Sequence, residues 1–313
     1  MKNASLLIHP EELSYKWIDR MVAHKIPTLG LHPVGGLKTD ETFANLLKTL
    51  EQPEFRAMVD DAIEKGLKIE YEMHVIRYLL PASEFDAHPD WFRMNDQGER
   101  VSDFNFCASN EEALDFVAER AAEVAKKLYR GSNRYFMWLD DSKNTACHCP
   151  KCREFSPSDQ QLIILNRMLA RLQKDNPDAE LAYLAYHDCI KAPTKVKPIK
   201  GIFVEYAPIS RDFHRPLCES EQSEPLEALI ALFGKTGAKA LDYWYDNSLF
   251  SKWKKPPVHF EVDAEVLHAD FAYYRSLGFE DIGCFACYLG KDYEDLYGEE
   301  PDISEFAKAY YTE

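Results

Sequence analysis

The sequence predicts a single (β/α)8 barrel over residues 1–313. Three observations support this fold class. Short apolar runs recur eight times along the chain, most of them precede a stretch with helical spacing of apolar residues, and no linker or change of composition divides the chain. An open, doubly wound sheet is the alternative, and the lack of a glycine-rich phosphate loop after the first run disfavours it.

The predicted strands are the apolar runs, taken in order along the chain. They cover residues 5–9, 27–32, 68–78, 134–139, 180–186, 201–206, 239–245 and 281–288. The predicted helices carry apolar residues on one face and cover residues 13–21, a stretch near 39, 55–63, 114–128, 162–172, 225–233, 263–277 and 303–311. The link between the fifth and sixth runs, residues 190–200, is too short and too rich in Pro and Lys for a regular helix.

Local signals mark where several helices begin and end. Gly66 and Gly278 are expected just past the ends of two helices, where a left-handed residue closes the last turn. Ser109 and Glu112 form a Ser-x-x-Glu capping box. Pro157 is expected at the first position of the helix that follows it, where its missing N–H costs nothing.

Composition limits the partners of this chain. Hydrophobic residues make up 46% of it, which is enough for a sizeable core, and 37 Lys and Arg against 53 Asp and Glu give a net charge of −16. That acidity argues against nucleic acid or an anionic membrane as a partner. No run reaches the roughly 18 apolar residues of a membrane span. Eight cysteines in a chain whose start does not read as an export signal predict reduced thiols and a cytoplasmic location.

Polar and aromatic side chains collect at the predicted carboxyl ends of the strands, which form the working face of such a barrel. The expected substrate-binding residues at these ends are His32, His74, Trp138, His187, Glu205, Tyr243, Trp244 and Asp246. The aromatic rings offer flat faces on which the C–H faces of a sugar can stack. The imidazoles and carboxylates can hydrogen-bond its hydroxyl groups. The pattern therefore predicts a carbohydrate substrate.

Asp140 and Asp141 directly follow a strongly apolar strand. Two nearby carboxylates in a partly dry pocket push their pKa values apart, so that one keeps its proton near neutral pH. We expect Asp141 to donate a proton to the leaving group and Asp140 to stay ionised and position the substrate. Adjacent strand residues point to opposite faces, so both reach one site only if the strand flares at its end. Glu205 is the next candidate acid.

A cysteine-rich loop follows this acidic pair. Cys147, Cys149 and Cys152 lie within six residues, a spacing typical of tetrahedral zinc sites. Cys107 is the first candidate for a fourth ligand, because neighbouring strands bring their loops together, and His148 is the second. A redox-active pair is the alternative. The expected metal is structural, because three thiolates leave little Lewis acidity, and no organic cofactor is expected.

Several motifs resemble an uncharacterised bacterial family of (β/α)8 proteins related to glycoside hydrolases. They are Glu72-Met73-His74, Leu79-Leu80-Pro81, His88-Pro89-Asp90-Trp91-Phe92, Phe106-Cys107-Ala108-Ser109-Asn110 and Trp138-Leu139-Asp140-Asp141. The barrel resembles those of β-N-acetylhexosaminidases, O-GlcNAc hydrolases and α-glucuronidases. The resemblance implies that Asp140 orients an acetamido group and that Asp141 is the general acid. The Asp-Asp pair matches the O-GlcNAc hydrolases better than the hexosaminidases, whose second acid is Glu.

The sequence thus predicts a glycoside-hydrolase-like barrel that acts on a carbohydrate. Two further functions stay open. One is a non-catalytic sugar-binding barrel, and the other is a metal-dependent hydrolase or isomerase built on His9, His32, His74 and His187. The first run lacks a His-x-His pair and the fourth ends without Lys, which disfavours the metal-dependent enzyme.

Overall fold

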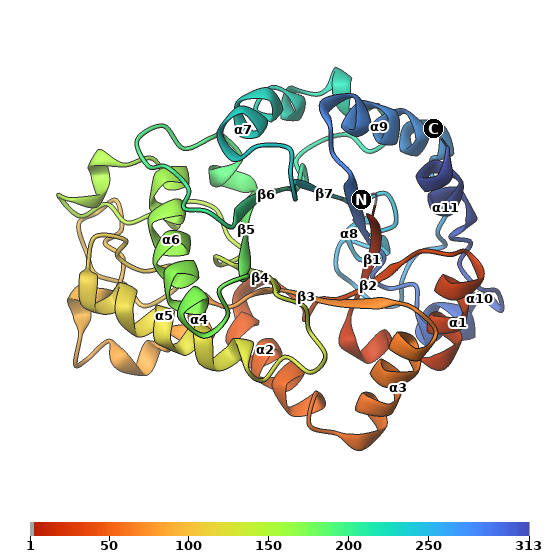
Figure 1. Ribbon diagram of the computed structural model, residues 1–313, viewed down its shortest axis with the longest axis horizontal. Helices are drawn as coiled ribbons and strands as arrows, with labels where there is room; N and C mark the ends of the chain where they lie inside the picture. The colour runs from red at the N-terminus through yellow and green to blue at the C-terminus, as the bar shows by residue number, and fades with distance from the viewer. Residues whose placement is uncertain (1–2, 313) are drawn as a thin grey trace.

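The computed structural model describes residues 3–312 and shows a closed barrel of eight parallel strands (Figure 1). The strands are β1 (Asn3–Ile8), β2 (Thr28–Leu31), β3 (Lys68–His74), β4 (Arg134–Trp138), β5 (Glu180–Ala185), β6 (Ile202–Tyr206), β7 (Lys239–Asp242) and β8 (Asp281–Phe285). Each strand pairs in parallel with the next in sequence, and β8 closes the barrel against β1. The predicted fold class is confirmed.

The α-helices surround the barrel (Figure 1). They are α1 (Tyr15–Ala23), α2 (Thr39–Thr49), α3 (Pro53–Glu64), α4 (Ile76–Leu79), α5 (Glu111–Ala125), α6 (Pro157–Asp175), α7 (Leu226–Phe233), α8 (Asn247–Phe250), α9 (Ala264–Leu277), α10 (Lys291–Tyr297) and α11 (Ser304–Tyr311). Residues 190–200, between β5 and β6, contain no helix, as their composition predicts. Within residues 3–312, no helix is both long and apolar enough to cross a membrane.

Most predicted helix boundaries are confirmed by the backbone. Gly66 has a φ of 93° and Gly278 a φ of 96°, and both lie in the left-handed region just past a helix end. Pro157 is the first residue of α6, behind the capping residue Ser156. These positions show that the start and stop signals in the sequence act locally, before tertiary packing is considered.

The predicted capping box at Ser109 is wrong. Asn110 is the capping residue of α5 instead, and its side chain accepts a hydrogen bond from the Ala113 N–H. The Ser109 hydroxyl lies 3.4 Å from the Cys107 sulfur and 3.5 Å from the Cys149 sulfur. A tertiary contact with the cysteine loop has therefore displaced the local motif.

The barrel interior is filled by alternate residues of each strand. One buried cluster of such residues comprises Leu7, Phe136, Trp138, Ala182, Leu184, Phe203, Leu241, Tyr243 and Phe285. Gly30 in β2 is required there, because a Cβ atom at that position would lie 2.6 Å from Cγ of Leu7. The interior is thus a packed core and not a pore, as is usual for this architecture.

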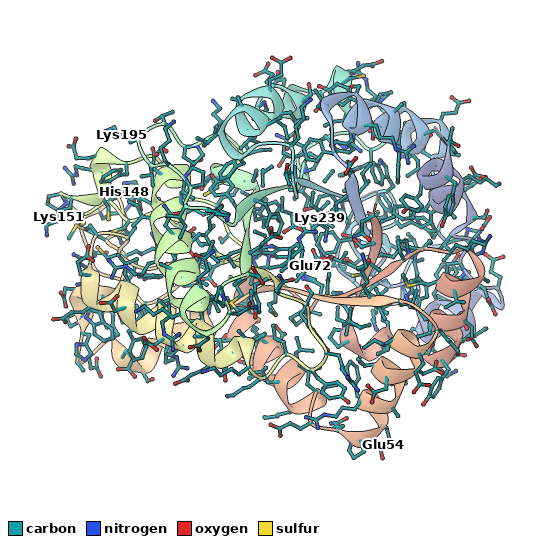
Figure 2. The ribbon with its side chains drawn as sticks, viewed as in Figure 1. Glu54, Glu72, His148, Lys151, Lys195 and Lys239 are labelled. Carbon is teal, nitrogen blue, oxygen red and sulfur yellow. The ribbon has the colours of Figure 1, made fainter. Side chains whose placement is uncertain are left out.

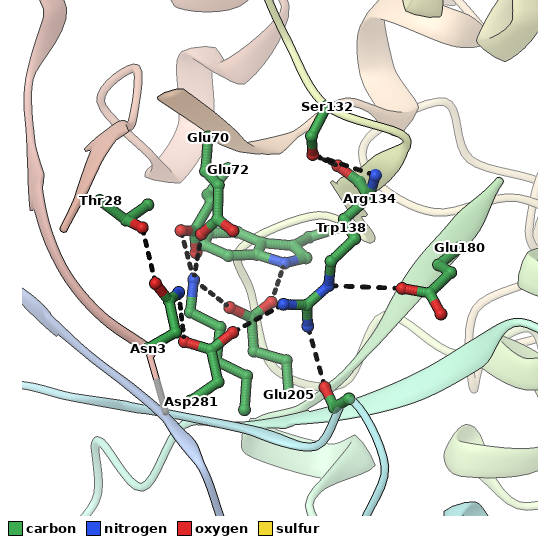
Figure 3. A network of polar contacts seen from close by, with 12 residues as sticks. Asn3, Thr28, Glu70, Glu72, Ser132, Arg134, Trp138, Glu180, Glu205 and Asp281 are labelled. Carbon is green, nitrogen blue, oxygen red and sulfur yellow. Dashed lines mark hydrogen bonds and ion pairs between the residues drawn. The ribbon is translucent and has the colours of Figure 1, made fainter. Parts of the chain in front are cut away.

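A buried ion-pair network lies inside the barrel (Figure 3). The ammonium group of Lys239 lies 2.5 Å from Glu72, 3.1 Å from Glu70 and 3.5 Å from Glu205. Glu205 also accepts a hydrogen bond of 2.7 Å from the indole N–H of Trp138. The network joins β3, β4, β6 and β7 across the barrel axis.

Candidate active site

A cavity of about 460 Å³ opens at the carboxyl ends of the strands. Seven of the predicted site residues line it: His32, His74, Trp138, Asp141, His187, Tyr243 and Asp246. His9, Tyr186, Trp253, Phe285, Cys287 and Tyr288 also contribute to its wall. We refer to it as the mouth cavity. It joins two carboxyl groups, four imidazoles and a wall of aromatic rings in one space.

Two predicted binding residues do not line the mouth cavity. Trp244 follows Tyr243 in sequence and therefore points away from the barrel, where its indole N–H donates to Asp270 of α9 at 2.9 Å. Glu205 is fully buried inside the barrel, where it pairs with Lys239 and Trp138. Its strand position places it a layer below the cavity, so the structure gives it no route to a substrate.

The structure also separates Asp140 from Asp141. Strand β4 ends at Trp138, and the chain then turns so that only Asp141 lines the mouth cavity. The Asp140 carboxyl lines a separate, smaller cavity. One of its oxygens accepts a 3.4 Å hydrogen bond from the Arg77 N–H, and the other is buried without a hydrogen-bond partner among residues 3–312. The carboxyl pair expected to share one site therefore does not share it.

Asp141 is held by the loops that follow β2 and β5. Its carboxylate accepts a hydrogen bond from the Gly36 N–H at 2.9 Å and another from the Tyr186 hydroxyl at 3.0 Å. Gly35 permits this approach, because a Cβ atom there would lie 2.6 Å from the carboxylate oxygen. The His187 imidazole lies 4.0 Å away. These contacts fix the orientation of the carboxylate at the cavity wall.

The surroundings of Asp141 favour its ionised form. Burial alone would raise the pKa of this carboxyl, but the His74 imidazole and the Tyr186 hydroxyl outweigh burial and hold the pKa below its ordinary value. This direction is opposite to the one expected for a proton donor. Burial raises the pKa of Asp246, on the same cavity, above its ordinary value. The two carboxyl groups of the mouth cavity are thus driven apart in pKa, as an acid and a charged partner require.

Three histidines at the ends of consecutive strands direct the same ring nitrogen at a backbone carbonyl. The Nδ1 atoms of His9 and His32 each lie 2.8 Å from a backbone carbonyl, and Nδ1 of His74 contacts the Leu139 carbonyl. A carbonyl only accepts, so each Nδ1 carries a hydrogen. Burial, with the neighbouring His9 imidazole, lowers the pKa of His32 to about 3. The Nε2 atom of His32 is therefore a neutral acceptor for a hydroxyl group.

The histidines do not form a common metal site in residues 3–312. His9 groups only with Glu12 and Cys287 as possible ligands, and His32 and His74 join no such group. The ring centroids of His9 and His32 are 5.9 Å apart. A metal-dependent enzyme built on the strand-end histidines is therefore not supported by the geometry.

Sequence reasoning missed several aromatic residues of the cavity wall. Tyr186 ends a predicted strand, so its position carried a signal. Trp253 lies in the loop after α8, and no sequence pattern marked it as a site residue. Its side chain is 62% exposed at the cavity rim. Large exposed indoles on a cavity rim are typical of binding surfaces.

The four predicted zinc ligands come together away from this cavity. Cys107, Cys147, Cys149 and Cys152 are buried, and their sulfur atoms all lie within 4.8 Å of one another. His148, the alternative ligand, is exposed. It lies at the outer edge of the molecule, far from Lys239 in the barrel centre (Figure 2).

Asp140 should make stability depend on pH. Burial raises its pKa from 3.8 to about 7. Between these two pKa values the folded chain holds a proton that the unfolded chain has lost. Asp140 therefore lowers the free energy of unfolding progressively as pH rises from about 4 to about 7, and above about pH 7 the reduction stays constant. The effect is at most about 4 kcal/mol. Asp140→Asn should remove it.

Chemical denaturation of both proteins from about pH 4 to about pH 8 measures this difference. The free energy of unfolding of Asp140→Asn, relative to that of the native chain, should increase as pH rises. Other titratable groups contribute equally to both proteins, so their effects on the free energy of unfolding cancel in the difference. Two curves that run parallel over the range would contradict the burial argument for Asp140.

A closed barrel of eight parallel strands with carboxyls, imidazoles and aromatic rings around one cavity at its strand ends is a (β/α)8 protein. The chain belongs to the family DUF4838, described as a domain of unknown function, which matches residues 38–275. The resemblance to an uncharacterised family of barrel proteins is confirmed. No curated protein matches the chain.

Solved structures of glycoside hydrolases share the fold. An O-GlcNAc hydrolase of Thermobaculum terrenum has a TM-score of 0.55 at 12% identity, over 99% of this chain and 58% of its own. A GH5 xyloglucanase of Bacteroides ovatus, in complex with a XXXG heptasaccharide, has a TM-score of 0.52 at 12% identity. The match covers 96% of this chain and 67% of the xyloglucanase. ZgEngAGH5_4, in complex with a cellotriose, has a TM-score of 0.51 at 12% identity. The match covers 96% of this chain and 88% of ZgEngAGH5_4. At this identity the similarity shows the barrel fold alone.

Proposed function

We propose that this protein hydrolyses a glycoside in the mouth cavity, with Asp141 and Asp246 as its two working carboxyl groups. The observation that carries the proposal is the opposite direction of their pKa shifts on one cavity. The raised pKa favours a protonated Asp246, which can act as the donor, and the lowered pKa favours a negative charge on Asp141. Two carboxyl groups in these two states are what most glycosidases use.

The reaction proposed for this site needs no cofactor. Asp246 donates its proton to the leaving-group oxygen, and Asp141 stabilises the positive charge that develops at the anomeric carbon. The glycosidic bond breaks, a water molecule adds to the anomeric carbon, and the proton that this water gives up returns to Asp246. These roles replace those expected from the sequence, where Asp141 was the donor and Asp140 the positioning group.

The rest of the cavity suits a sugar. Tyr243 stacks on Phe285 with ring centroids 5.1 Å apart, which provides a flat apolar wall. The neutral imidazole of His32 can accept a hydrogen bond from a hydroxyl group. The cavity volume of about 460 Å³ has room for one or two sugar rings. Two structural relatives carry bound oligosaccharides in barrels of this fold, which supports a carbohydrate as the ligand.

The test is a panel of natural and aryl glycosides, with release of reducing sugar followed by mass spectrometry. The proposal expects turnover of at least one member by the native chain and a rate about 10²–10⁴-fold lower by Asp141→Asn. A non-catalytic sugar-binding barrel is the second candidate, because the aromatic wall alone can bind sugar. It predicts equal oligosaccharide affinity in both proteins and no product from either.

Trp253→Ala should weaken oligosaccharide binding without unfolding the chain. The indole is 62% exposed on the cavity rim, so its removal leaves no buried cavity. A stacked ring contributes on the order of 1 kcal/mol, so the Kd should rise about fivefold. Calorimetric titration measures the change. Tyr15→Ala removes an aromatic ring of 50% exposure outside the cavity and serves as the control; an equal loss in both variants would contradict the role of Trp253.

A further inference from the structure

Four buried thiols meet where the loop after β3 passes the loop after β4. The Cys107 sulfur lies 3.7 Å from that of Cys149 and 3.8 Å from that of Cys152. All four thiols are free. A zinc–sulfur bond is about 2.3 Å long, and a regular tetrahedron with that radius has edges of about 3.8 Å. The measured separations match the edges of a tetrathiolate site.

We propose that Cys107, Cys147, Cys149 and Cys152 bind one zinc ion in a tetrahedral site. Four sulfur ligands fill the coordination sphere, which leaves no position for a substrate or a water molecule. The ion is therefore structural. The proposal does not depend on glycoside hydrolysis, since the site is separate from the mouth cavity.

Donors around the sulfurs fit a set of thiolates. The Met94 N–H donates to the Cys147 sulfur at 3.3 Å, and the Cys152 N–H donates to the Cys149 sulfur at 3.4 Å. The Arg100 guanidinium lies 3.9 Å from the Cys147 sulfur. Hydrogen bonds and a positive charge around the ligands stabilise the negative charge that four thiolates bring to a divalent ion.

The loop backbone is also held in place for coordination. Gln160 of α6 accepts a 2.9 Å hydrogen bond from the Cys147 N–H. Its amide nitrogen donates to the carbonyls of Cys147 and Cys152, each at 3.1 Å. This buried side chain fixes the turn that carries three of the four ligands. The ligands are thus oriented by contacts outside the coordination sphere, as in established metal sites.

The ion would join two loops that have little regular structure of their own. The first loop supplies Cys107 and also Asn105, whose side-chain oxygen accepts a 2.9 Å hydrogen bond from the Asp140 N–H. The second loop supplies the other three ligands and begins at the end of β4. Zinc would therefore hold the segment from which Asp141 reaches the mouth cavity.

Elemental analysis tests the proposal on the full chain, expressed with added zinc and purified without a chelator. We expect one zinc per chain in the native protein and in Cys218→Ser, which removes an exposed cysteine outside the cluster. Cys107→Ser and Cys152→Ser should lose it. Metal bound equally by all four proteins, or well below one equivalent in the native chain, overturns the proposal.

A second measurement uses only the native chain, because the serine variants can fail to fold. Cobalt exchanged for zinc should give an intense sulfur-to-cobalt charge-transfer band and the d–d bands of a tetrahedral site. Removal of the metal by a chelator should lower the Tm by more than about 5 °C, since coordination energy is partly folding energy. One iron per chain in place of zinc, or a disulfide found by mass spectrometry, overturns zinc as the occupant.

Discussion

Asp141→Asn should lower the rate of glycoside hydrolysis by about 10²–10⁴-fold, for good and poor leaving groups alike. The reason is the ionised state of Asp141, which His74 and Tyr186 stabilise. A neutral amide cannot stabilise the positive charge at the anomeric carbon. Because that charge develops whichever group departs, the loss should not depend on the leaving group.

Asp246→Asn should behave differently. Its carboxyl is the proposed proton donor, so the loss should be about 10²–10⁴-fold for alkyl glycosides and much smaller for aryl glycosides whose leaving groups need no proton. Asp140→Asn is the matched control, since it removes a neighbouring carboxyl outside the cavity. It should leave kcat within a few-fold of the native value.

The leaving-group dependence decides between two assignments. If Asp141→Asn spares only the aryl glycosides, Asp141 is the donor that the strand-end argument predicted. If Asp140→Asn abolishes hydrolysis, the carboxyl pair after β4 acts together in spite of the separate cavities. Either result would remove Asp246 from the acid role proposed for it.

The barrel could be predicted from the sequence because its signal is repeated. Strands buried on both faces appear as apolar runs, and the chain contains eight of them with helices between most. The carboxyl ends of these runs then locate the working face. His74, Asp141 and Asp246 were found in this way, without any knowledge of their contacts.

The sequence-based predictions of site residues fail where the result depends on the direction in which a side chain points. Tyr243 and Trp244 are adjacent, so only one of them can face the barrel axis. Asp140 and Asp141 follow the last strand residue, where strand alternation no longer applies and the turn sets their directions. Trp253 reaches the cavity from a distant loop, and no local pattern predicts such a contact.

Lys239→Met should reduce the free energy of unfolding by about 3–5 kcal/mol at neutral pH. The ammonium group is fully buried and contacts Glu70, Glu72 and Glu205 within 3.5 Å. Burial raises the pKa of Glu72 and of Glu205, and the positive charge of Lys239 is the largest influence that opposes this at both carboxyls. Its removal leaves carboxyl groups in the core without a counter-charge.

The pH dependence of this loss identifies its cause. Without Lys239, the carboxyls bind protons more readily, so the destabilisation should shrink as pH falls and Glu72 and Glu205 become neutral. Lys239→Met combined with Glu72→Gln should regain part of the stability at neutral pH, because the two sites are coupled. Lys68→Met, at the exposed start of β3, should change stability by less than about 0.5 kcal/mol. A loss in Lys239→Met that is the same at acid and neutral pH would assign it to lost packing and not to unpaired charge.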